Sequence, residues 1–248
     1  MMYTHTTVAA QPGIMFVNGG RSLIIQGNAM PLLTMAAAKP RSPAQCQKPH
    51  GWRGRIVLWS MNRRHSRVTD WGLAHVSVGE RDTVLDVGCG GGRTVSKLAA
   101  AASKGAVYGI DYSSESVAAA RRTNRQSIAE GRVAIEQASV SDLPFPDDTF
   151  DLVTAVETHF WWQDLGAGMR EVFRVVKPGG CLIIIAEFYN GGKYAKYADR
   201  LSRWTSMAVL DVAQHERAFS DAGFIEVRIV EQPRAGWICG VGRKPALA

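Results

Sequence analysis

The sequence predicts an α/β fold in which a mostly parallel, seven-stranded sheet has helices on both faces and ends in an antiparallel hairpin. Three observations support this. Short apolar runs alternate with amphipathic helical patterns after Arg81, and turn-forming residues separate them. Near the end, two strand-like runs are joined by a short connection containing Pro233, as in a hairpin. Parallel strands need helical crossovers, which the alternation supplies.

The first part of the chain has a different character. Residues 1–50 mix Gly, Pro, Ala, Thr and Gln without sustained periodicity, which predicts a disordered or irregular leader. A helix-compatible pattern of apolar residues among arginines follows, and we expect an N-terminal helical lid over residues 51–80. The main domain would then occupy residues 81–248.

Within that domain the elements are expected in a regular order. Strands are expected at 83–87, 106–110, 133–137, 150–156 and 181–187, and helices at 94–102, 114–129 and 167–176. Lys177-Pro-Gly-Gly180 is expected to stop the third helix and turn the chain. Residues 193–222 have helical patterns, with a helical insertion at about 190–215, and 224–231 and 236–242 form the expected hairpin.

Composition narrows the class of protein. With 248 residues and 46% apolar composition, one α/β domain with appendages is favoured over two small domains. The four cysteines have neither metal-ligand nor redox spacing, so we expect no metal and a reducing cytoplasm. No run approaches the ~18 apolar residues that span a bilayer, and the N-terminus is a poor signal peptide. A cytoplasmic protein without a membrane span is predicted.

The net charge of +7 is unevenly distributed. Residues 1–82 hold ten Lys and Arg against three Asp and Glu, which leaves nineteen of each class (29 − 10 and 22 − 3) in residues 83–248. A basic N-terminal third could bind nucleic acid or anionic lipid. We favour the simpler interpretation, a solvated leader followed by helix-surface arginines.

The stretch Val84-Leu-Asp-Val-Gly-Cys-Gly-Gly-Gly-Arg-Thr94 places four glycines in five positions directly after the first expected strand. In a doubly wound sheet this loop feeds the N-terminus of a helix and lies where ligands bind. Glycines there permit positive φ and let the backbone approach a ligand closely. Asp111, at the end of the second strand, is placed to accept hydrogen bonds from a ribose.

These features leave the ligand open. The dinucleotide pattern G-x-G-x-x-G fits Gly88 and Gly90, but Arg93 occupies its third position, and no Gly-Lys-Ser/Thr follows for a phosphate-binding Walker A loop. Asp86 distinguishes between these ligands better than the glycines do. Its carboxylate would repel a pyrophosphate, whereas it suits a ligand with an ammonium or sulfonium charge.

Five segments within residues 83–224 form a recognisable series. They are Val84-Leu-Asp-Val-Gly-Cys-Gly-Gly-Gly92, Gly109-Ile-Asp-Tyr-Ser113, Leu143-Pro-Phe-Pro-Asp-Asp-Thr-Phe-Asp151, Glu171-Val-Phe-Arg-Val-Val-Lys-Pro-Gly-Gly180 and Asp221-Ala-Gly-Phe224. In this order they resemble the Rossmann-like (class I) S-adenosylmethionine-dependent methyltransferases, and they look most similar to the branch with ubiquinone/menaquinone-type C-methyltransferases and many small-molecule methylases.

The resemblance implies S-adenosylmethionine as cofactor and a set of residues around it. The methionine part would lie against the first loop and the end of the fourth strand, the ribose and adenine against the second loop, and the adenine edge against the third. These residues are Asp86, Gly88, Cys89, Gly90, Ala155 and Val156; Asp111 and Tyr112; and Ser139, Val140, Ser141 and Asp142. Cys89 would be only a small loop residue. Many relatives have Asp where Ser139 stands, so Ser139, Ser141 or Asp142 would take its place at the adenine amino group.

The methyl acceptor is expected at the ends of the fourth and fifth strands. Glu157 and His159 are candidates for orienting or deprotonating it, and Trp161, Trp162 and Tyr189 for lining its pocket, although aromatic residues here can also be plain packing. Related enzymes place a lid over this side. In the expected lid, Asn62 and His65 share a helical face and Trp71 could close the pocket, with His65 also a catalytic candidate.

The sequence therefore predicts a metal-independent methyltransferase that acts on a small molecule by in-line displacement, as a monomer or homodimer. Nucleic acid is disfavoured as acceptor, because no Pro-Pro dipeptide and no cysteine directly after a proline occur. The atom methylated stays open. Two alternatives remain: an NAD(P)-dependent oxidoreductase that uses the same loop, and a cofactor-binding, RNA-associated module that uses the basic N-terminal third.

Overall fold

The computed structural model describes residues 66–191, 193–204 and 207–246. The expected leader, residues 51–65 of the expected lid, and the candidates Asn62 and His65 lie outside these ranges. Helix α3 (Ser66–Leu73) is the described end of the expected lid segment, and it packs mainly against strands β5 and β7.

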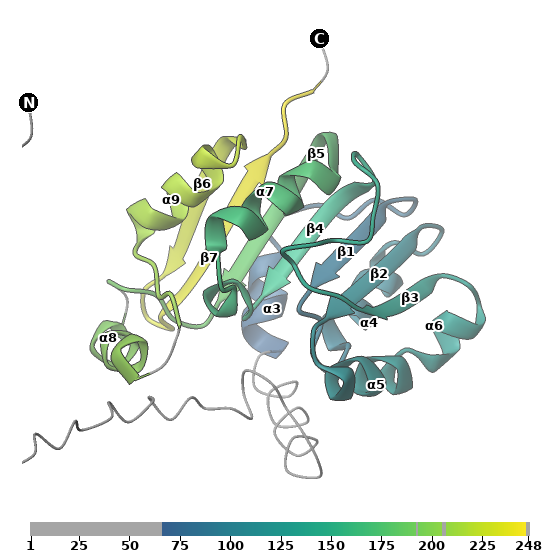
Figure 1. Cartoon of the computed structure of the whole chain (residues 1–248), viewed down its shortest axis with the longest axis horizontal. Coiled ribbons are helices and arrows are strands. Elements are labelled where there is room, and N and C mark those ends of the chain that lie inside the picture. The colour runs from purple at the N-terminus through teal and green to yellow at the C-terminus, as the bar shows by residue number, and fades with distance from the viewer. Residues whose placement is uncertain (1–65, 192, 205–206, 247–248) are drawn as a thin grey trace, which may run out of the picture. The chain divides into compact units, whose positions relative to one another are not determined.

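Seven strands form one sheet in the order β3-β2-β1-β4-β5-β7-β6 (Figure 1). Strands β1 to β5 run parallel, whereas β7 is antiparallel to both β5 and β6. The predicted fold class is thus confirmed. The strands are β1 (Thr83–Val87), β2 (Ala106–Asp111), β3 (Val133–Gln137), β4 (Phe150–Val156), β5 (Val176–Ala186), β6 (Ile225–Gln232) and β7 (Trp237–Arg243).

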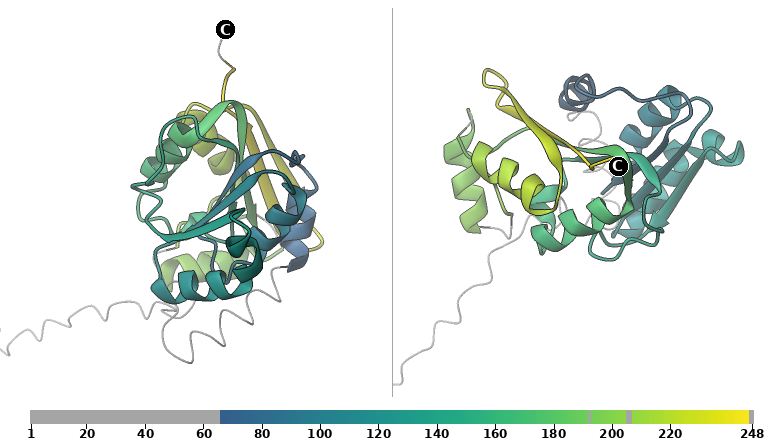
Figure 2. Two further views of the ribbon diagram at one scale, coloured as in Figure 1. Left: turned by 90° about the vertical axis from the view of Figure 1, so that its right-hand side faces the viewer. Right: turned by 90° about the horizontal axis from the view of Figure 1, so that it is seen from above.

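Helices cover both faces of the sheet (Figures 1 and 2). One apolar cluster joins the sheet to α3, α4 and α5, and a second joins the other face to α7 and α9. Three of the helices begin at a side chain that accepts from a free backbone amide: Ser113 for α5, Asp164 for α7 and Asp211 for α9. The helices are α4 (Arg93–Ala101), α5 (Ser114–Thr123), α6 (Arg125–Ala129), the 3₁₀ turn η1 (His159–Trp161), α7 (Leu165–Val175), α8 (Ala195–Trp204) and α9 (Val212–Asp221).

Two expected elements differ in detail. The helix predicted over 114–129 is divided at Asn124, whose side-chain amide donates to the carbonyl oxygens of Ala120 and Gly92 at 2.9 Å each. Strand β5 begins directly after α7, five residues earlier than expected. Phe150 pairs with Val176 and Leu152 with Cys181, so the intervening Lys177-Pro-Gly-Gly180 segment is accommodated as an irregularity inside β5.

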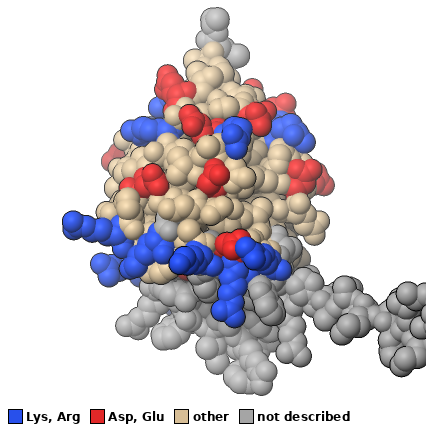
Figure 3. Space-filling view, turned by 90° about the vertical axis from the view of Figure 1, so that its left-hand side faces the viewer, with Lys and Arg blue, Asp and Glu red and all other residues tan. Residues whose placement is uncertain are grey.

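Charged side chains mark one side of the molecule. Figure 3 shows Lys and Arg gathered along the lower part of the face that α8, α9 and β6 occupy. Helix α8 carries the exposed Lys196, Arg200 and Arg203, of which Arg203 pairs with Asp199. No helix in the described ranges is both long enough and apolar enough to cross a bilayer.

Candidate functional site

A cavity of about 270 Å³ lies at the carboxyl ends of the parallel strands, bordered by the residues that follow β1, β2, β3 and β4. Eight predicted site residues line it: Gly88, Asp111, Tyr112, Ser139, Val140, Ser141, Trp161 and Trp162. Five further residues line it that the sequence did not single out: Val87, Ile110, Ala138, Thr158 and Gln163. Among all of these, Asp111 is the one charged side chain, so the described wall of the cavity is acidic and contains no Lys or Arg.

Asp111 is held rigidly at the end of β2. Its two carboxylate oxygens accept hydrogen bonds from the backbone amides of Gly90 and Ser113, each at 2.9 Å. Burial raises the pKa of this carboxyl, and the two amides partly offset that effect. Each carboxylate oxygen can accept more than one hydrogen bond, so Asp111 can also accept from a pair of ligand hydroxyls.

Asp86 lies deeper, at the end of β1. Its side chain is buried and accepts a hydrogen bond from Thr154 Oγ1 at 2.6 Å on the adjacent strand β4. The pKa of Asp86 is raised to about 7: burial is the main cause, the hydrogen bond from Thr154 lowers it in part, and the nearby Asp111 adds a smaller increase. Two carboxylates at neighbouring strand ends fit a cationic ligand and would oppose a pyrophosphate.

The glycine loop lies against β2 and against Thr158, just after β4. Gly88 has φ +71°, and a Cβ at this position would lie 2.2 Å from Thr158 Oγ1. Gly90 also has positive φ, but a Cβ there would meet nothing within 4 Å. Cys89 donates its amide to Ile110 at 2.8 Å, and burial raises the pKa of its thiol, which suits a small packing residue.

The segment after β3 forms another wall. Ser139 Oγ accepts from the amide of Ser141 at 3.2 Å, and an isolated bridge links Ser139 to Asp142. Ser139, Val140 and Ser141 line the cavity, whereas Asp142 is exposed and does not. The turn therefore brings Ser139 and Ser141, and not Asp142, to the cavity.

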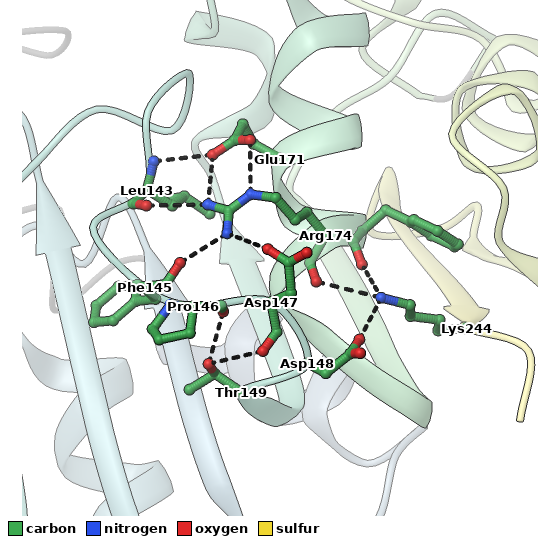
Figure 4. A network of polar contacts seen from close by, with 10 residues as sticks. Leu143, Phe145, Pro146, Asp147, Asp148, Thr149, Glu171, Arg174 and Lys244 are labelled. Carbon is green, nitrogen blue, oxygen red and sulfur yellow. Dashed lines mark hydrogen bonds and ion pairs between the residues drawn. The ribbon is translucent and has the colours of Figure 1, made fainter. Parts of the chain in front are cut away.

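A network of ion pairs and hydrogen bonds fixes the chain just beyond this wall (Figure 4). Arg174 of α7 donates to both carboxylate oxygens of Glu171 and to the carbonyl oxygens of Leu143 and Phe145, and it also pairs with Asp147. Glu171 in turn accepts from the amide of Leu143 at 3.1 Å. The loop after Ser141 is thereby tied to α7, which makes the cavity wall rigid.

The end of β4 has an unusual backbone. Glu157 is buried and has φ +57°, a left-handed conformation that is uncommon for residues other than glycine. Its amide donates to Ile185 at 2.9 Å, which fixes the turn from β4 into η1. Ala155 and Val156 precede it in β4 but do not line the cavity. Such conformations cluster at functional sites.

His159 follows in η1 and is buried. Its Nε2 lies 3.1 Å from Nε2 of His215 in α9, and burial, reinforced by His215, holds the pKa of His159 well below its usual range. Its Nδ1 is buried without a hydrogen-bond partner in the described part of the chain. His215 had no signal in the sequence, because 55 residues separate it from His159 and it sits in an ordinary amphipathic helix.

The aromatic candidates divide into two groups. Trp161 and Trp162 line the cavity, and the Trp162 ring also packs over Gly168 of α7. Trp71 packs against Trp237 of β7, and Tyr189 is buried and hydrogen-bonded to Glu231; neither lines the cavity. Within the described ranges, His, Cys, Asp and Glu form no cluster of three or more arranged to hold a metal ion.

Comparison with known proteins agrees with this geometry. Residues 85–184 match the family described as "Methyltransferase domain". The ubiquinone/menaquinone biosynthesis C-methyltransferase UbiE of Geobacter sulfurreducens is 37% identical over 132 residues, 53% of this chain and 50% of that protein. The 27-O-demethylrifamycin SV methyltransferase of Amycolatopsis mediterranei is 33% identical over 141 residues, 51% of this chain and 52% of that protein. The chain spans about half the length of these relatives.

Solved structures share the fold. A methyltransferase in complex with the Haloferax volcanii Trm112 activator matches with TM-score 0.68 and 23% identity, over 83% of this chain and 99% of that one. A SAM-dependent methyltransferase from Aquifex aeolicus matches with TM-score 0.58 and 24% identity, over 71% of this chain and 88% of that one. The nicotinamide alternative receives no support. Residues 85–184 therefore match a methyltransferase domain, and the fold around them is that of the Rossmann-like, class I S-adenosylmethionine-dependent methyltransferases, whose cofactor is S-adenosylmethionine.

Proposed function

We propose that this protein transfers the methyl group of S-adenosylmethionine to a small-molecule acceptor. One observation carries the proposal: the described wall of the cavity contains a single charged side chain, the doubly anchored Asp111, and no cation that would bind phosphate. A carboxylate at the end of β2 accepts from ribose hydroxyls, and an acidic site favours a cationic donor over a dinucleotide.

The cofactor supplies an activated methyl group and its leaving group, so the protein can contribute mainly by alignment and exclusion of water. In the proposed arrangement Asp111 holds the ribose, and Tyr112 and Ser139 to Ser141 border the adenine. Asp86 lies behind the glycine loop and favours positive charge at the methionine end. Gly90, with open space where a side chain would stand, leaves room for the ligand.

A small organic acceptor is supported by the lining of the cavity beyond the glycine loop. Trp161, Trp162 and Thr158 offer an apolar wall with one hydroxyl, typical of sites for small molecules. The two relatives named above are a methyltransferase of ubiquinone/menaquinone biosynthesis and a methyltransferase of 27-O-demethylrifamycin SV. We keep Glu157 and His159 as the proposed acceptor-side groups. His65, Asn62, Trp71 and Tyr189 stay proposed contributors to the acceptor site, although Trp71 and Tyr189 do not line the described cavity.

We also propose that the protein works in a reducing cytoplasm, as a monomer or homodimer and without a metal. Cys89, Cys181 and Cys239 are free, which fits such a compartment.

The proposal is tested by incubating the full chain with S-adenosylmethionine labelled in its methyl group and with small phenols, carboxylic acids, amines and quinols. Appearance of label in one acceptor, together with S-adenosylhomocysteine, is the expected result. An RNA arm run at low and high salt separates the remaining alternative: salt-dependent RNA binding without turnover of any small acceptor would contradict a small-molecule methyltransferase.

A further inference from the structure

A second groove lies between helices α7 and α9, which cover the same face of the sheet (Figure 1). Its volume is about 310 Å³. The groove and the cofactor cavity have no lining residue in common, although Gln163 lines the cavity and Leu165 lines the groove. The groove is therefore a separate place on the molecule, and the proposed methyl transfer does not use it.

Four apolar side chains line this groove. Met169 of α7 is buried, and Leu165 of α7 with Ala218 and Ala222 of α9 are partly buried. Because Ala218 and Ala222 lie one helical turn apart and have short side chains, they leave space between the two helices. Pockets for small molecules typically have volumes of about 300–1,000 Å³, apolar linings and a few polar groups. The volume and lining thus suit a small apolar body.

The polar groups of the groove are mainly hydrogen-bond donors. Arg170 comes from α7 and Arg217 from α9, and neither has an ion-pair or hydrogen-bond partner among the described residues. Gln214 is the third donor: its side-chain oxygen accepts from the amide of Asp211 at 2.8 Å, which leaves its NH₂ group for a ligand. Asp221 is the one acidic side chain in the described lining. Two guanidiniums and one carboxylate give a net charge of +1 (2 − 1).

The guanidinium of Arg170 lies near the first turn of α7. A Cβ at Gly166 would stand 3.3 Å from Arg170 Nη1, so glycine at this position leaves the space that the guanidinium needs. The first turn of a helix carries partial positive charge on its free amides. Asp164 lies at this end too, but it is not in the lining, and its Oδ1 accepts from the amide of Ala167 at 2.8 Å. Positive charge is thus concentrated where α7 begins.

We propose that this groove is a second ligand site, which binds a small apolar molecule that carries one carboxylate. The carboxylate lies between Arg170 and Arg217, each of which can donate two parallel hydrogen bonds to it, and the apolar body rests against Met169. A net charge of +1 matches one carboxylate, whereas a phosphate dianion would be repelled by Asp221. This second site does not depend on the proposed methyl transfer.

Methyl NMR on the full chain tests this site, because Met169 is part of the lining. The methionine methyl groups are labelled with ¹³C, S-adenosylhomocysteine is added in excess, and Met169→Leu identifies the Met169 signal by its loss. Phenylacetate, 4-phenylbutanoate and octanoate are titrated beside their carboxamides, which have the same shape without the charge. We expect a saturable shift of the Met169 signal with at least one carboxylate, and about tenfold weaker binding of its carboxamide.

Charge variants locate the carboxylate. Arg170→Gln and Arg217→Gln should each weaken binding of the carboxylate by about fivefold and change that of the carboxamide by less than about twofold. Asp221→Asn removes the opposing charge and should tighten binding of the carboxylate by about two- to fivefold. Arg122→Gln is the matched control and should change neither Kd, because Arg122 is an exposed arginine on α5 without a partner among the described residues.

Several results would overturn the proposal. Equal affinities for a carboxylate and its carboxamide, or an equal loss of carboxylate affinity in Arg122→Gln, would mean that Arg170 and Arg217 do not select the ligand. The absence of a saturable Met169 shift with all three carboxylates would show that the groove takes no such molecule. A hexaglutamate peptide that binds more tightly than all three, and that needs both arginines, would assign the groove to a protein partner instead.

The same titration without S-adenosylhomocysteine separates this site from the proposed function. If the chain does not bind S-adenosylhomocysteine, the proposed function fails, while the groove should still bind the carboxylate with an unchanged Kd. If S-adenosylhomocysteine binds but no carboxylate moves the Met169 signal, the second site fails while methyl transfer stands.

Discussion

The two halves of the sheet's carboxyl edge differ in how their buried polar groups are satisfied. After β1, β2 and β3, Asp111 is bound by two backbone amides and Asp86 by Thr154. After β4, Glu157 holds a left-handed backbone and His159 keeps a buried ring nitrogen without a partner in the described ranges. The buried carboxylates of the half proposed to bind the cofactor thus have hydrogen-bond partners within the described domain, whereas the half proposed to bind the acceptor keeps a buried ring nitrogen, Nδ1 of His159, without one among the described residues.

The largest expected effect is a loss of stability in the acceptor half, where one of two adjacent tryptophans is a core residue and the other a proposed ligand contact. Trp162 is buried and lies over Gly168, so Trp162→Ala should lower the free energy of unfolding by roughly 3–5 kcal/mol. Trp161 is only partly buried, and Trp161→Ala should cost about 1–2 kcal/mol while raising the KM for the acceptor. Urea denaturation and steady-state kinetics measure the two effects. Equal losses of stability would place Trp161 in the core and contradict this division.

The glycine loop tests the cofactor half. Gly88→Ala forces both a left-handed alanine and a collision with Thr158, for an expected loss of roughly 2–4 kcal/mol in the free energy of unfolding. Gly90→Ala is the matched control, because it has the same sign of φ and open space, and should cost only about 1–2 kcal/mol. The double variant Gly88→Ala, Thr158→Ala should recover part of the difference. No recovery would mean that Thr158 does not set the loop.

A smaller effect comes from the charge of Asp86. Its pKa is about 7 in the folded protein and 3.8 as the ordinary value, so between these values the folded state binds more protons than the unfolded state. The contribution of Asp86 to the free energy of unfolding of the ligand-free protein should therefore fall as pH rises from about 4 to 7. The expected fall between pH 5 and pH 7 is roughly 2–3 kcal/mol.

Urea titrations at several pH values check this, with the variant Asp86→Asn expected to lose that part of the pH dependence. Glu136→Gln, which removes an exposed carboxylate on β3, serves as the matched control and should leave the profile unchanged. An identical profile for wild type and Asp86→Asn would show that Asp86 titrates in the folded state as it does in the unfolded chain.

Much of the fold was predictable because apolar periodicity determines which segments cross the sheet. The bounds expected for β1, β3 and β4 agree with the structure. The division of the helix at Asn124 was not predictable, since it depends on a side-chain hydrogen bond to Gly92, 32 positions earlier in the chain. The irregular start of β5 likewise depends on pairing with β4 across the Lys177-Pro-Gly-Gly180 segment.

The site divides in the same way. Gly88 and Asp111 could be predicted as site residues from local pattern alone. A ligand loop after a strand needs glycine, and a ribose needs a hydrogen-bond acceptor at the end of the next strand. Thr158 and His215 make contacts that form only on folding: Thr158, just after β4, lies against the glycine loop, and Nε2 of His215 in α9 lies 3.1 Å from Nε2 of His159. Sequence pattern does not contain such distances, so these residues were missed.

Calorimetric titration of the wild-type chain with S-adenosylhomocysteine and, separately, with NADH tests the central claim most directly, with Asp111→Asn as the matched variant. We expect one molecule of S-adenosylhomocysteine bound per chain, no heat of binding with NADH, and at least a roughly 100-fold loss of affinity, about 2.7 kcal/mol, in Asp111→Asn. Binding of NADH in place of S-adenosylhomocysteine, or equal affinity in the variant, would contradict the account.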